Sequence, residues 1–326
     1  MPTKPTIFLA ILLLLLAACT TNQPNSTAAD KPIPKETPTR QLAITIDDLP
    51  GISLNDYQAV TDNLLTTLKA FQAPAIGFVN EGKLYQKNKL NKKRFAVLED
   101  WLKAGMELGN HTYSHPDYNK LTFAEYTADL TKGERHTKAL QAKHQQQMRY
   151  FRHPFLHMGD TAEKEAELAN FLTEHGYTVA PVTIDNSEWL IARAYYLAQR
   201  ANNKAQMDSI GNAYVEYMED MTAYYEQQSE QLFGRPIMHT LLLHANALNG
   251  DYLDELLAMY RKRGYEFISL TEALTDSVYQ SDNTYVTRGG ISWIHRWAKT
   301  QGVDRSFFAG EPTCPEFIQT IAGIKE

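Results

Sequence analysis

Apolar residues along the chain follow two alternating spacings from Gln41 to Leu274. Short runs rich in β-branched and aromatic residues are separated by longer segments in which apolar positions recur every three or four residues. The first pattern is typical of buried strands and the second of amphipathic helices. We expect strands at 42–47, 75–79, 106–110, 148–152, 177–184, 237–244 and 265–269. We expect helices at 55–72, 92–104, 123–145, 162–175 and 252–263.

Seven strands joined in succession by helical segments predict a parallel α/β sheet, because a parallel return strand needs a crossover connection. Gly105, Gly176 and Gly264 each follow a predicted helix, where a left-handed residue commonly ends the helix. An open, doubly wound sheet is one alternative. A distorted (β/α)7 barrel suits seven repeats better, and in barrels the chemistry lies at the carboxyl ends of the strands.

The segment 191–234 lies between the fifth and sixth predicted strands and is too long for one crossover helix. Its tyrosine-rich pattern predicts a helical insertion of two helices. These tyrosines are expected to pack the helices onto the barrel, and the alternative is that they wall one side of the active-site mouth. Residues 276–326 form a C-terminal extension packed on the barrel, in which Trp293 and Trp297 share one helix face.

The composition is that of an ordinary globular protein, with 326 residues, 43% hydrophobic, 21% charged and a net charge of −6. The basic runs at 92–94 and 261–263 are short, and short charge runs are typical of solvated helix faces. The sequence therefore predicts no nucleic-acid partner.

The N-terminus has the pattern of a targeting segment. Lys4 precedes an apolar run at 7–18 that is too short to span a bilayer as a helix. The run ends in Ala18-Cys19 and resembles a bacterial lipobox. The resemblance implies a signal peptide at 1–18, a lipid anchor at Cys19 and a position on the periplasmic side of the cell envelope. An ordinary secretory peptide is the alternative.

Thr20, which stands where an Asp would indicate retention in the inner membrane, favours the outer membrane. Residues 19–40 are rich in Pro and polar residues without an apolar period, which is typical of a flexible tether.

Two adjacent carboxylates, Asp47 and Asp48, end the first predicted strand. Neighbouring side chains of a strand point to opposite faces, so the two groups can take different roles as the chain turns. One could hold a metal and the other could move a proton. For an Asp pair alone, a polar turn after a strand is the commoner interpretation.

His111 and His115 follow the third predicted strand and can bind one metal only if the backbone turns. In a straight strand their Cα atoms would be about 13 Å apart, whereas on a helical turn the separation is about 6 Å. With one carboxylate they supply a ligand set that leaves positions open for water and substrate.

Five short motifs in this order resemble those of polysaccharide deacetylases, carbohydrate esterases with the NodB-homology domain. They lie at 45–48 (TIDD), 111–115 (HTYSH), 152–155 (RHPF), 185–189 (DNSEW) and 242–244 (LLH). The resemblance implies a NodB-like distorted barrel over 41–275 that removes acetyl groups from N- or O-acetylated sugars. It also implies a divalent metal, Zn²⁺ first, with Co²⁺ or Ni²⁺ as alternatives.

The resemblance implies a role for each motif residue. Asp48, His111 and His115 would hold the metal, which polarises the acetyl carbonyl and activates water. Asp47 would be the general base, and His244 would be the general acid that protonates the leaving group.

Other motif residues would position these groups or meet the substrate. Arg152 would pair with Asp47, and Asp185 would orient His244. The backbone N–H of Phe155, which stands where Tyr is usual in the family, would stabilise the oxyanion. Glu188 and Trp189 would lie on the substrate side.

The expected function is therefore deacetylation of an acetylated, most simply N-acetylated, cell-wall or extracellular polysaccharide. One rival is a same-fold amidase acting on a small non-sugar C–N bond, which a deep closed pocket would favour over an open groove. A second rival is a non-catalytic glycan-binding lipoprotein, which would not need Asp47 or His244.

Overall fold

The computed structural model describes residues 40–52 and 56–326. The predicted signal peptide, Cys19 and the tether up to residue 39 lie outside these residues. The strands are β1 (Arg40–Leu49), β2 (Ala75–Val79), β3 (Tyr85–Gln86), β4 (Lys89–Leu90), β5 (Glu107–Asn110), β6 (Tyr150–Phe151), β7 (Thr178–Val179), β8 (Met238–His244) and β9 (Tyr265–Ile268). The 3₁₀ helices are η1 (Glu81–Leu84), η2 (Tyr118–Lys120), η3 (Pro154–Leu156), η4 (Ser277–Gln280) and η5 (Arg305–Phe308).

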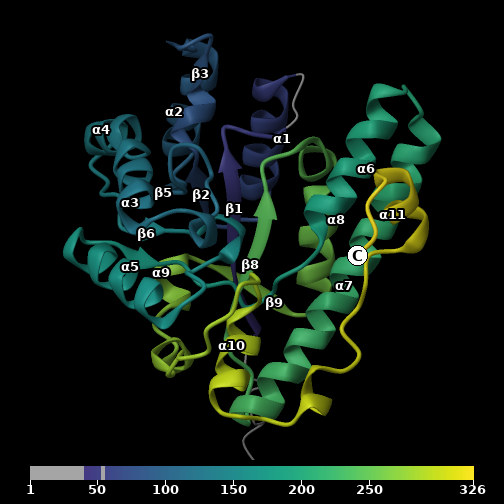
Figure 1. Ribbon diagram of the computed structural model, residues 1–326. Helices are drawn as coiled ribbons and strands as arrows, with labels where there is room; N and C mark the ends of the chain where they lie inside the picture. The colour runs from purple at the N-terminus through teal and green to yellow at the C-terminus, as the bar shows by residue number, and fades with distance from the viewer. Residues whose placement is uncertain (1–39, 53–55) are drawn as a thin grey trace, which may run out of the picture. The chain divides into compact units, whose positions relative to one another are not determined.

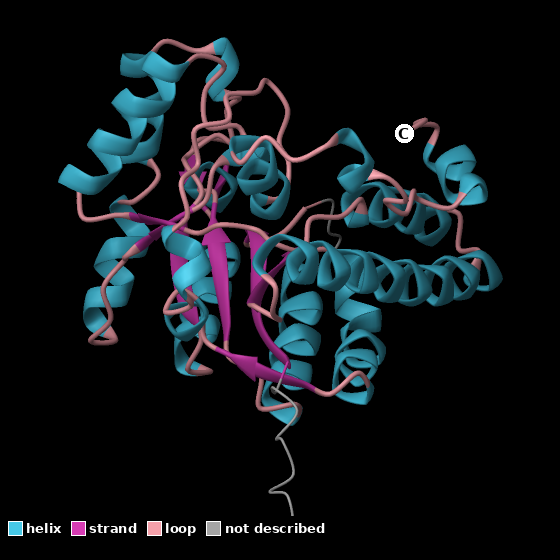
Figure 2. Ribbon diagram, turned by 90° about the horizontal axis from the view of Figure 1, so that it is seen from below, coloured by secondary structure: helices cyan, strands magenta, loops and turns pink. Residues whose placement is uncertain are grey.

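The α-helices surround these strands on several sides (Figures 1 and 2). They are α1 (Tyr57–Ala70), α2 (Lys92–Lys103), α3 (Phe123–Lys132), α4 (Arg135–Lys143), α5 (Ala162–Glu174), α6 (Glu188–Arg200), α7 (Lys204–Phe233), α8 (Ala247–Lys262), α9 (Leu270–Ala273), α10 (Trp293–Thr300) and α11 (Glu316–Ala322). Helices α6, α7, α8 and α11 gather beside β8, whereas α3, α4 and α5 lie beside β5 and β6 (Figure 1). Among the described helices, none combines the length and apolar character needed to cross a bilayer.

The sheet is parallel and curls into the expected distorted barrel. Its hydrogen-bonded order is β7-β6-β5-β2-β1-β8. Strand β9 pairs with the first residues of β1, Arg40–Ala43, and β2 pairs with the residues of β1 that follow. Past β7, the N–H of Ile184 donates to the carbonyl of Thr240 on β8, and Ile184 forms a parallel bridge with Leu241. This bridge links the segment after β7, at one end of the strand order, with β8 at the other end.

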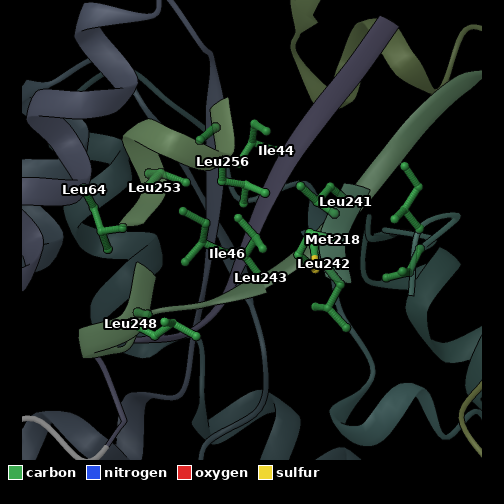
Figure 3. Close-up of a cluster of buried hydrophobic side chains, with 14 of the residues drawn as sticks. Ile44, Ile46, Leu64, Met218, Leu241, Leu242, Leu243, Leu248, Leu253 and Leu256 are labelled. Atoms are coloured by element: carbon green, nitrogen blue, oxygen red, sulfur yellow. The ribbon is translucent and has the colours of Figure 1, made fainter. Parts of the chain in front are cut away.

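The alternation of side chains along β1 separates the helix-facing core from the barrel interior. Ile44 and Ile46 pack with Leu243 of β8 and with leucines of α1 and α8 (Figure 3). Thr45 and Asp47 alternate with these residues and therefore face the interior. The apolar face that holds β1 against its helices thus also directs Asp47 inward.

Two local expectations are wrong. The single helix predicted at 123–145 is two helices, α3 and α4, with Gly133 between them. A Cβ atom at Gly133 would lie 2.4 Å from the carbonyl carbon of Thr112, so the glycine permits a close approach at which the helix breaks. The fifth strand, predicted at 177–184, is regular only at Thr178–Val179. The insertion does contain two helices, and the first begins earlier than expected, at Glu188.

Candidate functional site

The carboxylates of Asp47 and Asp48 face the same site, so the expectation of opposite faces is wrong at this turn. Asp48 has a φ of 72°, and the register of β1 against β2 shifts between Ile46 and Leu49. Such an irregularity re-aims a side chain that would otherwise follow the strand alternation. As a result, Nε2 of His111 lies 3.7 Å from Oδ2 of Asp47 and 4.0 Å from Oδ1 of Asp48.

The segment from His111 to His115 turns sharply, which brings the two imidazole rings to a centroid distance of 4.8 Å. Asp129 on α3 holds this turn. Its Oδ1 accepts the N–H groups of Tyr113 and Ser114 at 2.9 Å, and its Oδ2 accepts the Ser114 hydroxyl at 2.7 Å. The sequence analysis did not single out Asp129, because a lone Asp in a polar helix carries no signal.

Asp48, His111 and His115 offer ligand atoms that all lie within 4.8 Å of one another. Oδ1 of Asp48 is 3.8 Å from Nε2 of His115 and 4.0 Å from Nε2 of His111. Both distances are shorter than two metal–ligand bonds of about 2.1 Å laid end to end. Nδ1 of His111 donates to the Arg152 carbonyl at 2.8 Å, which leaves the Nε2 lone pair facing the cluster. The donor set therefore fits a divalent cation.

Lys83, which follows β2, places its ammonium 2.7 Å from Oδ1 of Asp48. Burial alone would raise the pKa of Asp48, but the charges of Lys83 and of the two imidazoles outweigh it and lower the pKa well below its usual range. Asp48 is therefore ionised, as a metal ligand must be. No spacing in the sequence connects Lys83 with Asp48.

Asp47 is buried next to the guanidinium of Arg152. Nη1 of Arg152 lies 3.6 Å from Oδ2 of Asp47, and Nη2 donates to Oγ1 of Thr45 at 2.8 Å. Burial raises the pKa of Asp47 to about 6, against the opposing charges of Arg152 and His244. A carboxylate with a pKa close to neutrality is suited to accepting a proton and releasing it again.

His244 is the register partner of Asp47 across the β1–β8 ladder. Its Nδ1 bonds Oε2 of Glu188 at 2.6 Å, and the other Glu188 oxygen accepts from the amides of Asn246 and Asn249. Burial would lower the pKa of His244, but the Glu188 carboxylate outweighs it and raises the pKa to about 9. His244 therefore carries a proton at neutral pH.

Two expectations about the fourth motif are wrong. Asp185 does not hydrogen-bond His244 among the residues that the structure describes, and its Oδ1 accepts the Asn186 N–H at 2.9 Å. The partner that His244 does have is Glu188, which was expected on the substrate side but has no exposed surface. The reason is the start of α6 at Glu188, since successive helical residues point in different directions. Trp189 points outward and is 49% exposed.

Asp185 nevertheless borders the site. Burial raises the pKa of Asp185 to about 7, and the nearby charges of Arg152 and His244 oppose this rise.

A cavity of about 720 Å³ lies over these groups. Its floor includes Asp47, Asp48, His111, His115 and His244. The side walls include Tyr217, Met221 and Tyr225 of α7, and Gly290, His295 and Glu311 of the C-terminal extension. The tyrosine-rich insertion therefore packs on the barrel and also walls the site. Phe155 and Trp189 are the large exposed aromatic residues in the lining.

The comparisons with known proteins agree with the motif resemblance over part of the chain. Residues 34–178 match the family model described as polysaccharide deacetylase. This part of the chain therefore belongs to the polysaccharide deacetylase family. It contains Asp47, Asp48, both cluster histidines and Arg152, whereas Glu188 and His244 lie beyond it. No curated protein matches the chain.

Several solved structures are similar at low sequence identity. A peptidoglycan deacetylase from Bacillus subtilis is 20% identical, with 73% of this chain and 91% of that chain covered and a TM-score of 0.46. A family 4 carbohydrate esterase from Streptomyces lividans is 19% identical, with 72% and 95% covered and a TM-score of 0.45. A family 4 pseudoenzyme from Bacillus anthracis is 17% identical, with 73% and 66% covered and a TM-score of 0.44.

We predict that Asp129→Ala weakens metal binding without unfolding the protein. The variant removes the acceptor that holds the turn between the two histidines, and loss of such a supporting contact typically costs about 10- to 100-fold in metal affinity. The measurement is a Zn²⁺ competition titration of the purified protein. Thr131→Ala, an exposed change on the same helix, should bind Zn²⁺ like the wild type. Equal affinity of the Asp129 variant and the wild type would show that the turn holds without this carboxylate.

Proposed function

We propose that this chain is a metal-dependent hydrolase that removes acetyl groups from N-acetylated glycans of the cell envelope. One observation carries the proposal. Asp47, with a pKa of about 6, and His244, with a pKa of about 9, are register partners on neighbouring strands beside the Asp48, His111 and His115 cluster. A proton acceptor and a proton donor thus border one ligand set, as amide hydrolysis requires.

A divalent cation held by Asp48, His111 and His115 supplies polarisation of the acetyl carbonyl and acidification of water. Asp47 accepts the proton of the attacking water, and the adjacent guanidinium of Arg152 favours the ionised carboxylate. His244 gives its proton to the leaving nitrogen, which departs as an amine only when protonated.

Phe155 and Trp189 offer the substrate a different kind of contact. The backbone N–H of Phe155 donates to the acetyl oxygen as negative charge develops there. The exposed rings of Phe155 and Trp189 present apolar faces in the cavity lining, and such faces can cover one side of a sugar ring.

The dimensions of the cavity favour a short glycan segment. A volume of about 720 Å³ is within the range of small-molecule pockets, and α7 and the C-terminal extension both wall it. The same enclosure supports a second candidate, an amidase of a small non-sugar substrate. Acetate release from N-acetylglucosamine oligomers of increasing length, from an O-acetylated glycan and from small acetamides separates these candidates.

We predict that Asp47→Asn abolishes acetate release and leaves metal binding intact. An amide cannot accept the water proton, and loss of a general base typically lowers kcat by about 10²- to 10⁴-fold. The experiment measures acetate release across the panel with Zn²⁺ or Co²⁺, together with the bound metal of each variant. Asp208→Asn, an exposed change on α7, is the matched control and should keep full activity.

The outcomes of this experiment are distinct. Loss of metal along with activity would place Asp47 in the ligand set. The distance of 3.7 Å between Oδ2 of Asp47 and Nε2 of His111 would allow the two atoms to share a cation. Wild-type protein with bound metal and no acetate release from any substrate would overturn the proposed function.

We predict that Glu188→Gln moves the alkaline limb of the pH–kcat profile to lower pH. The Glu188 carboxylate raises the pKa of His244, and the acid is active only while protonated, so activity falls as pH rises through that pKa. Without the carboxylate the pKa of His244 falls, and the limb should move by roughly one pH unit or more. Glu174→Gln, an exposed change on α5, should leave the profile unmoved. If the alkaline limb of Glu188→Gln stays at the wild-type pH, the limb reports the titration of a group other than His244.

We further propose lipid anchoring at Cys19 and a position on the periplasmic side of the envelope, with the outer membrane preferred. The support is the lipobox-like Ala18-Cys19 junction and the polar, Pro-containing sequence that follows it. Mass spectrometry of the mature N-terminus should find a diacylglycerol-modified Cys19, and Cys19→Ala should release the protein from the membrane fraction. An unmodified mature N-terminus would rule the anchor out.

A further inference from the structure

The C-terminal extension packs on the turn that the third motif forms. We call the segment 287–293 the strap. Gly290, in the strap, packs directly on the backbone of η3, the 3₁₀ turn that carries Phe155. The strap lies outside the part of the chain that matches the deacetylase family model.

The turn beneath the strap has a backbone that needs support. Phe155 has a φ of 57° and Leu156 a φ of 55°, so two successive residues with side chains occupy the left-handed region. Such conformations persist only where surrounding structure holds them in place. The orientation of the Phe155 N–H therefore depends on what packs on the turn.

The contact at Gly290 is too close for any side chain. A Cβ atom there would lie 1.9 Å from the carbonyl oxygen of Phe155 and 3.0 Å from Cβ of Leu156. The nearest atom belongs to the backbone and not to a flexible side chain. Gly289 differs, because its nearest neighbour would be Oγ1 of Thr287 at 4.0 Å.

The strap is fixed on both sides of Gly290 and cannot move away freely. Before it, the Arg288 carbonyl accepts from Nδ2 of Asn119 at 2.8 Å. After it, Oγ of Ser292 donates to the Thr183 carbonyl at 2.8 Å, and the N–H of Trp293 donates to the Val182 carbonyl at 2.7 Å. The turn, and not the strap, is therefore the part that a larger residue would displace.

We propose that Gly290 is a positioning residue, which holds the Phe155 turn so that its N–H points at the developing oxyanion. The inference rests on the proposed deacetylase function. An Ala at 290 would have to move the Phe155 carbonyl from 1.9 Å to at least 3.0 Å, and the N–H of the same residue would move with it. The ligand cluster lies on other segments, but the Phe155 ring packs edge-on against the His115 ring at a centroid distance of 4.5 Å, so the variants are compared at saturating Zn²⁺.

The test compares Gly290→Ala with Gly289→Ala in the full chain loaded with Zn²⁺. Neither glycine has a positive φ, so the two substitutions differ in the space around the new methyl group and not in backbone strain. Gly290→Ala should lower kcat about 100-fold, the typical cost of a displacement near 1 Å at a reacting centre. Its KM should stay near the wild-type value, because the lost contact forms in the transition state. Bound zinc is measured in each variant, so that kcat is compared at equal metal occupancy. Gly289→Ala should match the wild type throughout.

A second measurement does not depend on turnover. Acetate, titrated by NMR into each zinc-loaded protein, presents a carboxylate oxygen to the same N–H, and Gly290→Ala should bind it about tenfold more weakly than Gly289→Ala. If no substrate is turned over but this difference is found, the proposed function fails and the positioning role stands. If the wild type is active and the two glycine variants have equal kcat and acetate affinity, the positioning role fails and the function stands.

A variant away from the tight contact covers the case in which Gly290→Ala does not fold. Asn119→Ala removes the hydrogen bond to the Arg288 carbonyl and loosens one side of the strap. At equal zinc occupancy it should lower kcat about fivefold, in line with the loss of one hydrogen bond. Unchanged kcat and acetate affinity in Asn119→Ala would then overturn the proposal.

Discussion

The parallel ladder between β1 and β8 runs from the Gln41–Met238 pair to the Asp47–His244 pair, and the site depends on this register. A slip of one residue would turn Asp47 toward the helices and place Ile46 in the barrel interior. Ile44, Ile46 and Leu243 oppose such a slip, because their burial against α1 and α8 would be lost. The apolar packing outside the barrel therefore keeps a proton acceptor beside a proton donor inside it.

The interior of the site holds charges in pairs. Asp47 faces Arg152, Asp48 faces Lys83, and Glu188 binds His244. Each partner comes from a different segment, and an unpaired buried charge would be strongly destabilising. The pairs also set the protonation states, since burial raises the pKa of Asp47 while Glu188 raises that of His244. Stability and acid–base chemistry therefore rest on the same contacts.

The barrel supplies the ligand cluster and the Asp47–His244 pair, whereas the insertion and the C-terminal extension shape the space above them. The deacetylase family match ends at residue 178, and α7 and the C-terminal extension wall the cavity from beyond it. The strap also packs on the turn that carries Phe155. Functions are generally grafted onto shared folds by this kind of division, in which a barrel carries the polar side chains and added segments carry the walls.

The sequence by itself predicted most strands and helices, because hydrophobic periodicity is local. It also placed the two histidines and the Asp pair at one rim, because parallel strands end there, whereas the choice of Asp48 as the ligand came from the family motifs. It missed the break at Gly133, since the Thr112–Tyr113 backbone that packs against this glycine comes from another segment of the chain. Only the tertiary structure decided that Glu188 and not Asp185 binds His244, because the start and direction of α6 depend on packing. Lys83, Asp129 and Gly290 act through neighbours far away in the chain, and contacts of that kind leave no spacing for a sequence pattern to show.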